Sequence, residues 1–211
     1  MKERKENLTD LSNLIFRSGW AVRLVNLITI YRIIAAPILL YLAFSHQFEI
    51  FKWLLATSFF TDLIDGQLAR KYKATSVLGA KLDSIGDDLT VLVGVVGFFV
   101  ARPEFIQGHA IYFIILFVLF LIQLTYALVR YGKITSFHTY LAKLAALLQG
   151  IFLCGSFFFE TPWYTLFYIT FIIIALELIE ETIMVYILPQ WKNDVHGIYW
   201  ALQQKNTPST D

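Results

Sequence analysis

The sequence predicts an all-α integral membrane protein, with six transmembrane helices and an N-terminal amphipathic surface helix. Three observations support this class. Of the 211 residues, 57% are hydrophobic and only 16% are charged, whereas soluble domains carry about 25% charged residues. Six segments are apolar enough to lie in a bilayer core, which is about 30 Å thick. Lys and Arg are also divided very unevenly between the two sets of loops that these segments define.

The composition excludes three other classes of protein. A disordered chain lacks the apolar residues that are abundant here. A disulfide scaffold needs paired cysteines, and Cys154 is the single cysteine of the chain. A net charge of +1 provides no general attraction to nucleic acid, so we expect no nucleic-acid partner.

The six spans are predicted within one domain, residues 21–190. Five of them are apparent as long apolar runs: Leu24–Phe44, Ile50–Leu68, Ala110–Val129, Leu141–Phe159 and Trp163–Leu188. The sixth, Leu89–Val100, has 12 residues and would reach only about 18 Å as a helix. It can cross the bilayer only if it begins near Asp83. Asp83, Asp87 and Asp88 are therefore predicted at or just below the membrane surface.

The loops predict the orientation. Fourteen Lys and Arg residues fall on the side of both termini, and two, Lys52 and Arg102, fall on the other side. Positive residues concentrate in cytoplasmic loops. We therefore expect cytoplasmic termini and a multi-pass protein of the bacterial inner (cytoplasmic) membrane.

The segments that flank the domain have different characters. Residues 1–20 place Leu8, Leu11, Leu14 and Ile15 on one helical face, which predicts an amphipathic helix on the cytoplasmic surface. A frayed polar tail is the alternative. Residues 191–211 are predicted to be a cytoplasmic tail.

Four carboxylates are predicted to meet at the cytoplasmic end of the second and third spans. Asp62 and Asp65 are spaced i, i+3, and Asp83 and Asp87 are spaced i, i+4, so each pair lies on one helix face. A short loop joins the two helices into a hairpin, which brings the pairs to the same depth. Four acids near hydrocarbon repel one another. Divalent cations would relieve this repulsion, and Mg²⁺ binds carboxylate and phosphate oxygens together. Pairing with neighbouring Lys and Arg residues is the alternative.

Small and basic residues accompany the aspartates. Gly66 and Ala69 allow a ligand or a helix to approach the backbone closely. Arg70 is a permanent cation suited to a phosphate, and Gly79 precedes the third span. Simple helix packing is the alternative for the small residues.

The string Asp62-x2-Asp65-Gly66-x2-Ala69-Arg70-x8-Gly79-x3-Asp83-x3-Asp87 resembles the signature of the CDP-alcohol phosphatidyltransferases at all eight positions. The resemblance implies a membrane enzyme, commonly a homodimer, with a site that faces the cytoplasm. Such enzymes transfer a phosphatidyl group from CDP-diacylglycerol to an alcohol and release CMP.

The resemblance also implies roles for the signature residues. Two Mg²⁺ ions, with Mn²⁺ as the alternative, would be bound by Asp62, Asp65, Asp83 and Asp87. Asp87 would also be the general base for the acceptor hydroxyl. The cytidine diphosphate site would be lined by Gly66, Ala69, Arg70 and Gly79.

Two patterns point to different acceptors. Asn26, Thr29 and Arg32 share one face of the first span and resemble the branch that uses glycerol 3-phosphate, which makes that acceptor our first expectation. The pair Asp83-Ser84 looks more like the branches that use inositol, inositol phosphate or serine. Arg32 is expected to face the acidic site, with a structural pair to a carboxylate such as Glu177 as the alternative.

A second acidic group occurs in the last span. Glu177, Glu180 and Glu181 are expected either to pair with Arg32 or Lys143 or to shape the acceptor pocket. Several basic residues of the loop after the fourth span could bind an acceptor phosphate or could be ordinary cytoplasmic charges: Arg130, Lys133 and Lys143. His138 is expected to lie at a helix start or an interface.

Two other functions are alternatives to an enzyme. Intramembrane carboxylates also occur in cation transporters, but here no acidic series continues across the bilayer. A scaffold without activity has no need for costly acids beside small residues and an arginine.

Overall fold

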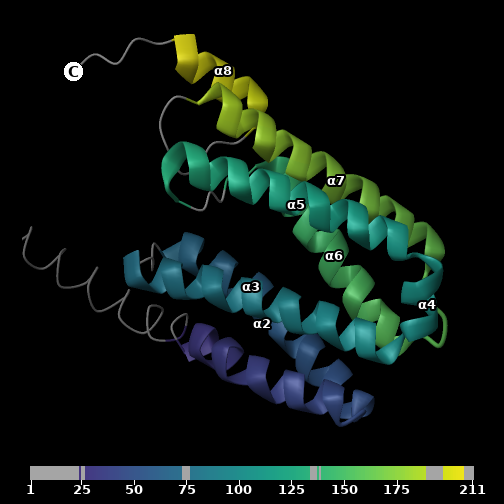
Figure 1. Ribbon diagram of the computed structural model, residues 1–211. Coiled ribbons are helices and arrows are strands. Elements are labelled where there is room, and N and C mark those ends of the chain that lie inside the picture. The colour runs from purple at the N-terminus through teal and green to yellow at the C-terminus, as the bar shows by residue number, and fades with distance from the viewer. Residues whose placement is uncertain are drawn as a thin grey trace, which may run out of the picture. The chain divides into compact units, whose positions relative to one another are not determined.

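The structure is a computed structural model. It describes residues 24, 27–72, 77–133, 137, 139–188 and 197–206, with side chains placed in these ranges except at 65–72, 77–81 and 203–206. The described residues form helices and connecting turns, and no strand occurs among them (Figure 1). The chain divides between Arg102 and Pro103 into two compact units, which are described separately.

The first unit contains three long helices. The first of these, Leu27–Phe44, carries Arg32 and is called the Arg32 helix below. It is followed by α2 (Phe48–Tyr72) and α3 (Val77–Ala101), which pack against each other. The pairing of α2 with α3 confirms the predicted hairpin. It brings the C-terminal part of α2 together with the N-terminal part of α3.

Part of the core of this unit is a close contact between α2 and α3. Phe51 of α2 is completely buried, and its ring lies against Gly97 of α3. A Cβ built on Gly97 would lie 2.3 Å from the Phe51 Cζ atom. The absence of a side chain at residue 97 therefore allows the two helices to approach closely.

The second unit is arranged around α7 (Tyr164–Ile187). This helix packs against α5 (Ala110–Tyr131), α6 (Tyr140–Phe158) and α8 (Ile198–Asn206), and α5 and α7 run side by side (Figure 1). The short helix α4 (Pro103–Gly108) precedes α5. The arrangement buries Phe167, Met184 and Val185 of α7.

Local residues define the ends of α5 and α6. Gly132 follows α5 in a left-handed conformation, with φ of 64°, and its N–H donates to the Leu128 carbonyl. Glycine adopts this conformation without steric cost. Thr139 caps the start of α6, where its hydroxyl accepts a hydrogen bond from the Ala142 N–H at 3.0 Å. His138 lies outside the described residues.

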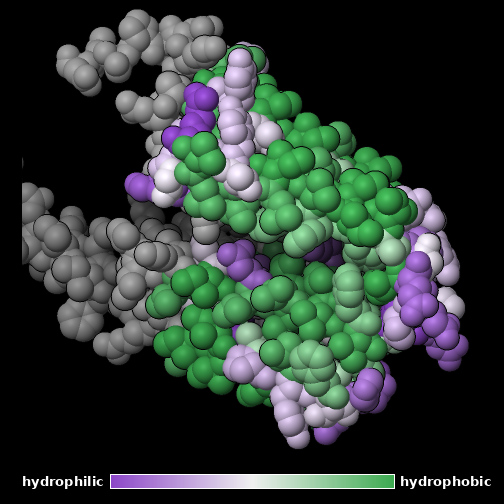
Figure 2. Space-filling view, viewed as in Figure 1, coloured by the Kyte–Doolittle hydropathy of each residue, from purple (hydrophilic) through white to green (hydrophobic). Residues whose placement is uncertain are grey.

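Four described helical segments are long and apolar enough to cross a membrane: Leu27–Phe44, Leu82–Ala101, Ala110–Tyr131 and Tyr140–Phe158. The third predicted span thus does extend back to the aspartates. The other two predicted spans correspond to α2 and α7, with 25 and 24 residues. Large apolar side chains are exposed along these helices, and hydrophobic residues dominate the face shown in Figure 2. Together with the four apolar segments, this outer surface is typical of a multi-pass membrane protein.

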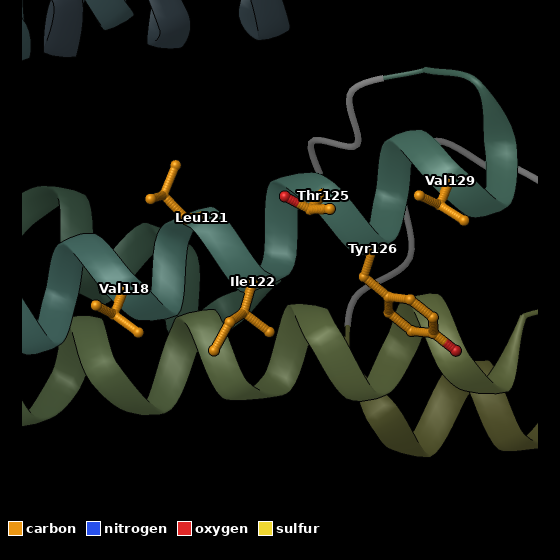
Figure 3. Close-up of a pocket in the computed structure, with 6 residues that line it drawn as sticks. All are labelled: Val118, Leu121, Ile122, Thr125, Tyr126 and Val129. Atoms are coloured by element: carbon orange, nitrogen blue, oxygen red, sulfur yellow. The ribbon is translucent and has the colours of Figure 1, made fainter.

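One side of α5 illustrates this surface. A shallow groove on this helix is lined by Val118, Leu121, Ile122, Thr125, Tyr126 and Val129 (Figure 3). All six residues come from α5, and Leu121, Ile122 and Val129 are exposed. The groove carries no ionisable group other than the Tyr126 phenol, so it is not a candidate catalytic site.

The predicted flanking segments are described only in part. Residues 1–20, where the surface helix is expected, lie outside the described residues. The predicted tail contains α8, a helix that no pattern in the sequence predicted. Ala201 of α8 is completely buried in a cluster with Met184, Val185 and Leu188. Docking on α7 therefore orders this part of the tail.

Candidate functional site

Three of the four predicted carboxylates converge in the first unit. Asp62 comes from α2, and Asp83 and Asp87 come from successive turns of α3. Each offers a carboxylate oxygen, and these oxygens all lie within 4.8 Å of one another. We call Asp62, Asp83 and Asp87 the acidic cluster. Their side chains are 33–43% exposed, so a ligand can reach the carboxylates.

Arg32 lies at the centre of the acidic cluster. Its Nη1 atom donates to Oδ1 of Asp62 and of Asp87, and its Nη2 atom donates to Oδ1 of Asp83. The Arg32 side chain itself is completely buried. The guanidinium therefore neutralises part of the repulsion between the carboxylates. The expectation that Arg32 faces the acidic site is confirmed.

Gly86 lies beside Arg32. It lies on α3 between Asp83 and Asp87 and is buried. A Cβ added there would lie 3.6 Å from the Arg32 Nε atom, which places the arginine stem directly against the α3 backbone. The Thr90 hydroxyl donates to the Gly86 carbonyl at 2.8 Å, so this buried polar group is satisfied. Gly86 is not among the predicted site residues, although its position between two of them was a usable signal.

The remaining signature residues lie on the same two helices. Asp65, Gly66, Ala69 and Arg70 belong to the last turns of α2, and Gly79 belongs to the first turn of α3. The side chains of these α2 residues are outside the described part of the structure. Asp88, which follows Asp87, is exposed.

The acidic cluster fits a divalent cation by the chemistry of its donors. Three carboxylates supply hard oxygen ligands, which suit Mg²⁺, Ca²⁺ or Mn²⁺. Their oxygens are close enough to contact a single positive group, as their shared contact with Arg32 demonstrates. The partial exposure of the carboxylates leaves a side from which a phosphate could approach.

The second acidic group, in α7, makes contacts of a different kind. Glu181 is buried and accepts hydrogen bonds from Gln123 Nε2 at 2.8 Å and from the Phe137 N–H at 3.3 Å. Both donors are neutral groups, whereas the expected partners Arg32 and Lys143 are cations. Gln123 lies on α5 and Phe137 lies in the α5–α6 connection. Glu181 therefore links α7 to α5 and to that connection.

The basic residues near the end of α5 and the start of α6 contact neighbouring helices or aromatic rings. Arg130 Nη2 donates to the Leu188 carbonyl at 3.2 Å, which suits a cation at the C-terminal end of α7. The Tyr131 hydroxyl donates to the carbonyls of Val185 and Leu188. Lys143 is exposed, with its Nζ atom 5.5 Å from the centre of the Tyr140 ring. These contacts give Arg130 a structural role at the α5–α7 contact. No pattern in the sequence indicated the Tyr131 contact.

Comparison with known proteins points to the chemistry of the acidic cluster. The sequence model of the CDP-alcohol phosphatidyltransferases matches residues 22–187. Those residues include all eight positions of the signature, the two helices α2 and α3 that hold the acidic cluster, and the Arg32 helix.

Two curated proteins are similar over parts of the chain. A CDP-diacylglycerol–glycerol-3-phosphate 3-phosphatidyltransferase of Pseudomonas fluorescens is 36% identical over 74 residues, which cover 34% of this chain and 38% of the relative. A CDP-diacylglycerol–inositol 3-phosphatidyltransferase of Saccharomyces cerevisiae is 40% identical over 62 residues, which cover 29% of this chain and 28% of the relative. The matched stretches thus span well under half of each relative. No solved structure matches the chain.

Proposed function

Because the chain belongs to the CDP-alcohol phosphatidyltransferase family, we propose that it transfers a phosphatidyl group from CDP-diacylglycerol to an alcohol and releases CMP. The observation that carries the proposal is the acidic cluster. Its members are signature aspartates from two helices, and their oxygens lie within 4.8 Å of one another. Such a site can hold the cation that a diphosphate substrate requires.

The proposed metal ligands are Asp62, Asp65, Asp83 and Asp87, binding two Mg²⁺ ions or Mn²⁺ in their place. When bound, these ions supply positive charge that neutralises the diphosphate of the CDP-lipid. Gly66, Ala69, Arg70 and Gly79 form the proposed cytidine diphosphate site. Arg70 contributes a permanent positive charge for a phosphate, and the small residues allow close approach to the backbone.

Asp87 is the proposed general base. It lies one helical turn further along α3 than Asp83, on the same face and towards the apolar part of the helix. The Asp87 carboxylate accepts the proton of the acceptor hydroxyl. The hydroxyl oxygen then forms a bond to the phosphorus that carries the diacylglycerol, the diphosphate P–O bond breaks, and CMP leaves.

Glycerol 3-phosphate is the proposed acceptor. The support is the Asn26, Thr29 and Arg32 pattern of the first span, together with the similarity to the Pseudomonas fluorescens enzyme. Inositol, inositol phosphate or serine is the alternative, supported by Asp83-Ser84 and by the similarity to the yeast enzyme. Rates of CMP release with each of these alcohols would identify the acceptor.

The proposed setting is a bacterial inner membrane, with the acidic cluster at the cytoplasmic surface. In this proposal α2 and α7 complete a set of six spans, and residues 1–20 form a surface helix. Residues 21–190 form the catalytic domain, residues 191–211 form a cytoplasmic tail, and two chains assemble as a homodimer.

The test is CMP release by the purified protein in detergent, with CDP-diacylglycerol, Mg²⁺ and each acceptor in turn. Asp87→Asn should lower the rate by about 10²- to 10⁴-fold, the usual contribution of a general base. Asp88→Asn is the matched control, because Asp88 is adjacent but exposed, and it should retain activity. No release with any acceptor from a folded protein, or equal losses in both variants, would contradict the proposal.

A further inference from the structure

Arg32 contacts the atoms that a divalent cation would need. Its two terminal nitrogens bond to one oxygen each of Asp62, Asp83 and Asp87. These are the three residues whose oxygens lie close enough together to hold a metal ion. A divalent cation bound by the same three oxygens would have to displace the guanidinium or lie beside its positive charge, which is unfavourable.

The charge of Arg32 is permanent and inaccessible to solvent. Its side chain is completely buried, and guanidinium remains protonated at any pH at which the protein is folded. The three carboxylates, which are 33–43% exposed, would repel one another without it, because like charges this close together are mutually destabilising. Among the described residues, Arg32 is therefore a cation that compensates the charge of all three carboxylates.

We propose that Arg32 is a built-in counter-ion of the acidic cluster, which stabilises the ion-free protein and competes with divalent cations for Asp62, Asp83 and Asp87. This inference rests on the metal site of the proposed function. Arg32 is then a positioning residue with two effects. It stabilises the acidic cluster when no ion is bound, and it lowers the affinity of the cluster for the ion.

Two measurements on Arg32→Met test the inference. The stability of the ion-free variant should fall, and its affinity for a divalent cation should rise. In EDTA, the thermal midpoint of the purified variant should fall by roughly 10 °C, because the repulsion between the three half-exposed carboxylates is no longer compensated. Millimolar Mg²⁺ should restore it. The Mn²⁺ dissociation constant, measured from the resonance signal of free Mn²⁺, should decrease by about tenfold or more, because a positive charge has left the site.

Two further variants separate charge from packing. Lys52→Met is the control, because it removes a cation of the same unit that pairs with Glu49 at 2.6 Å and does not belong to the acidic cluster. Its Mn²⁺ dissociation constant should equal that of the wild type, and Mg²⁺ should not change its thermal midpoint more than it changes that of the wild type. Arg32→Met/Asp83→Asn removes one positive and one negative charge together. If Arg32→Met yields no folded protein, a folded double variant supports the counter-ion role, and an unfolded one overturns it in favour of packing.

Other results would also overturn the inference. These are equal losses of stability in EDTA and in Mg²⁺, or Mn²⁺ binding that is unchanged or weaker in Arg32→Met. Failure of the proposed function is distinguishable: tight Mn²⁺ binding by the variant without CMP release by the wild type contradicts the phosphatidyltransferase proposal alone. CMP release by the wild type with unaltered Mn²⁺ binding by the variant contradicts the counter-ion role alone.

Discussion

At the scale of single residues, two glycines of α3 differ in whether a side chain could replace them. Gly86 accommodates the stem of Arg32 at ordinary contact distance, whereas Gly97 lies against the ring of Phe51. An added methyl group fits at residue 86 and overlaps the ring at residue 97. The packing of α2 on α3 therefore requires glycine at residue 97, whereas residue 86 could carry alanine beside Arg32.

Gly97→Ala should destabilise the protein by about 1–3 kcal/mol, because the new Cβ forces the buried Phe51 ring to move. Gly86→Ala is the matched control on the same helix. It should be neutral or slightly stabilising, since alanine favours helix by up to about 1 kcal/mol. Thermal unfolding in detergent measures both variants.

Gly97→Ala/Phe51→Leu should recover part of the lost stability, since the shorter side chain relieves the overlap. Equal midpoints for Gly97→Ala and Gly86→Ala would show that the close approach of α2 and α3 has no energetic importance.

At the scale of helices, α7 organises the second unit through polar as well as apolar contacts. Glu181 joins it to α5 and to the connection before α6, and Tyr131 joins its C-terminal end to α5. Buried polar groups of this kind are costly when a partner is missing. The polar contacts therefore specify which faces of α5 and α7 meet.

Gln123→Leu should destabilise the second unit by about 1–3 kcal/mol, because the Glu181 carboxylate loses a donor while remaining buried. Gln123→Leu/Glu181→Leu should be closer to the wild type, since no carboxylate is then left without that donor. Chemical unfolding curves of the single and double variants measure the difference. A double variant whose loss is the sum of the two single losses would exclude coupling between these residues.

At the scale of the whole molecule, the distribution of Lys and Arg predicts which connections share a side of the membrane. The loops that follow α3 and α6 are expected on the side opposite the termini. Cys154 is the only cysteine in the sequence, so a cysteine-free background needs one substitution.

Single cysteines in a Cys154→Ser background should map this topology. Arg102→Cys and Glu160→Cys should react with a membrane-impermeant maleimide in right-side-out vesicles. Lys133→Cys and Lys205→Cys should react only after the membrane is opened. Labelling of residues 102 and 133 from the same side would contradict a crossing by α5, and labelling of 160 and 205 from the same side would contradict a crossing by α7.

Patterns within the chain were sufficient to predict much of this protein. Apolar length predicted the helices, and the short apolar run after Asp88 indicated that the third span must begin near Asp83, where the apolar stretch of α3 does begin. The spacings of Asp62, Asp83 and Asp87 predicted that their carboxylates would meet at the end of a hairpin. These features depend on helical periodicity and bilayer thickness, which act on residues close in sequence.

The partners of the charged groups were decided by tertiary packing. Arg32 is separated from its three carboxylates by 30 to 55 residues, and Glu181 is separated from Gln123 by 58 residues. Helix α8 is ordered by the apolar surface of α7 near Met184. Periodicity identifies the face of a helix that is buried, but the partner that meets each side chain depends on how all the helices pack together.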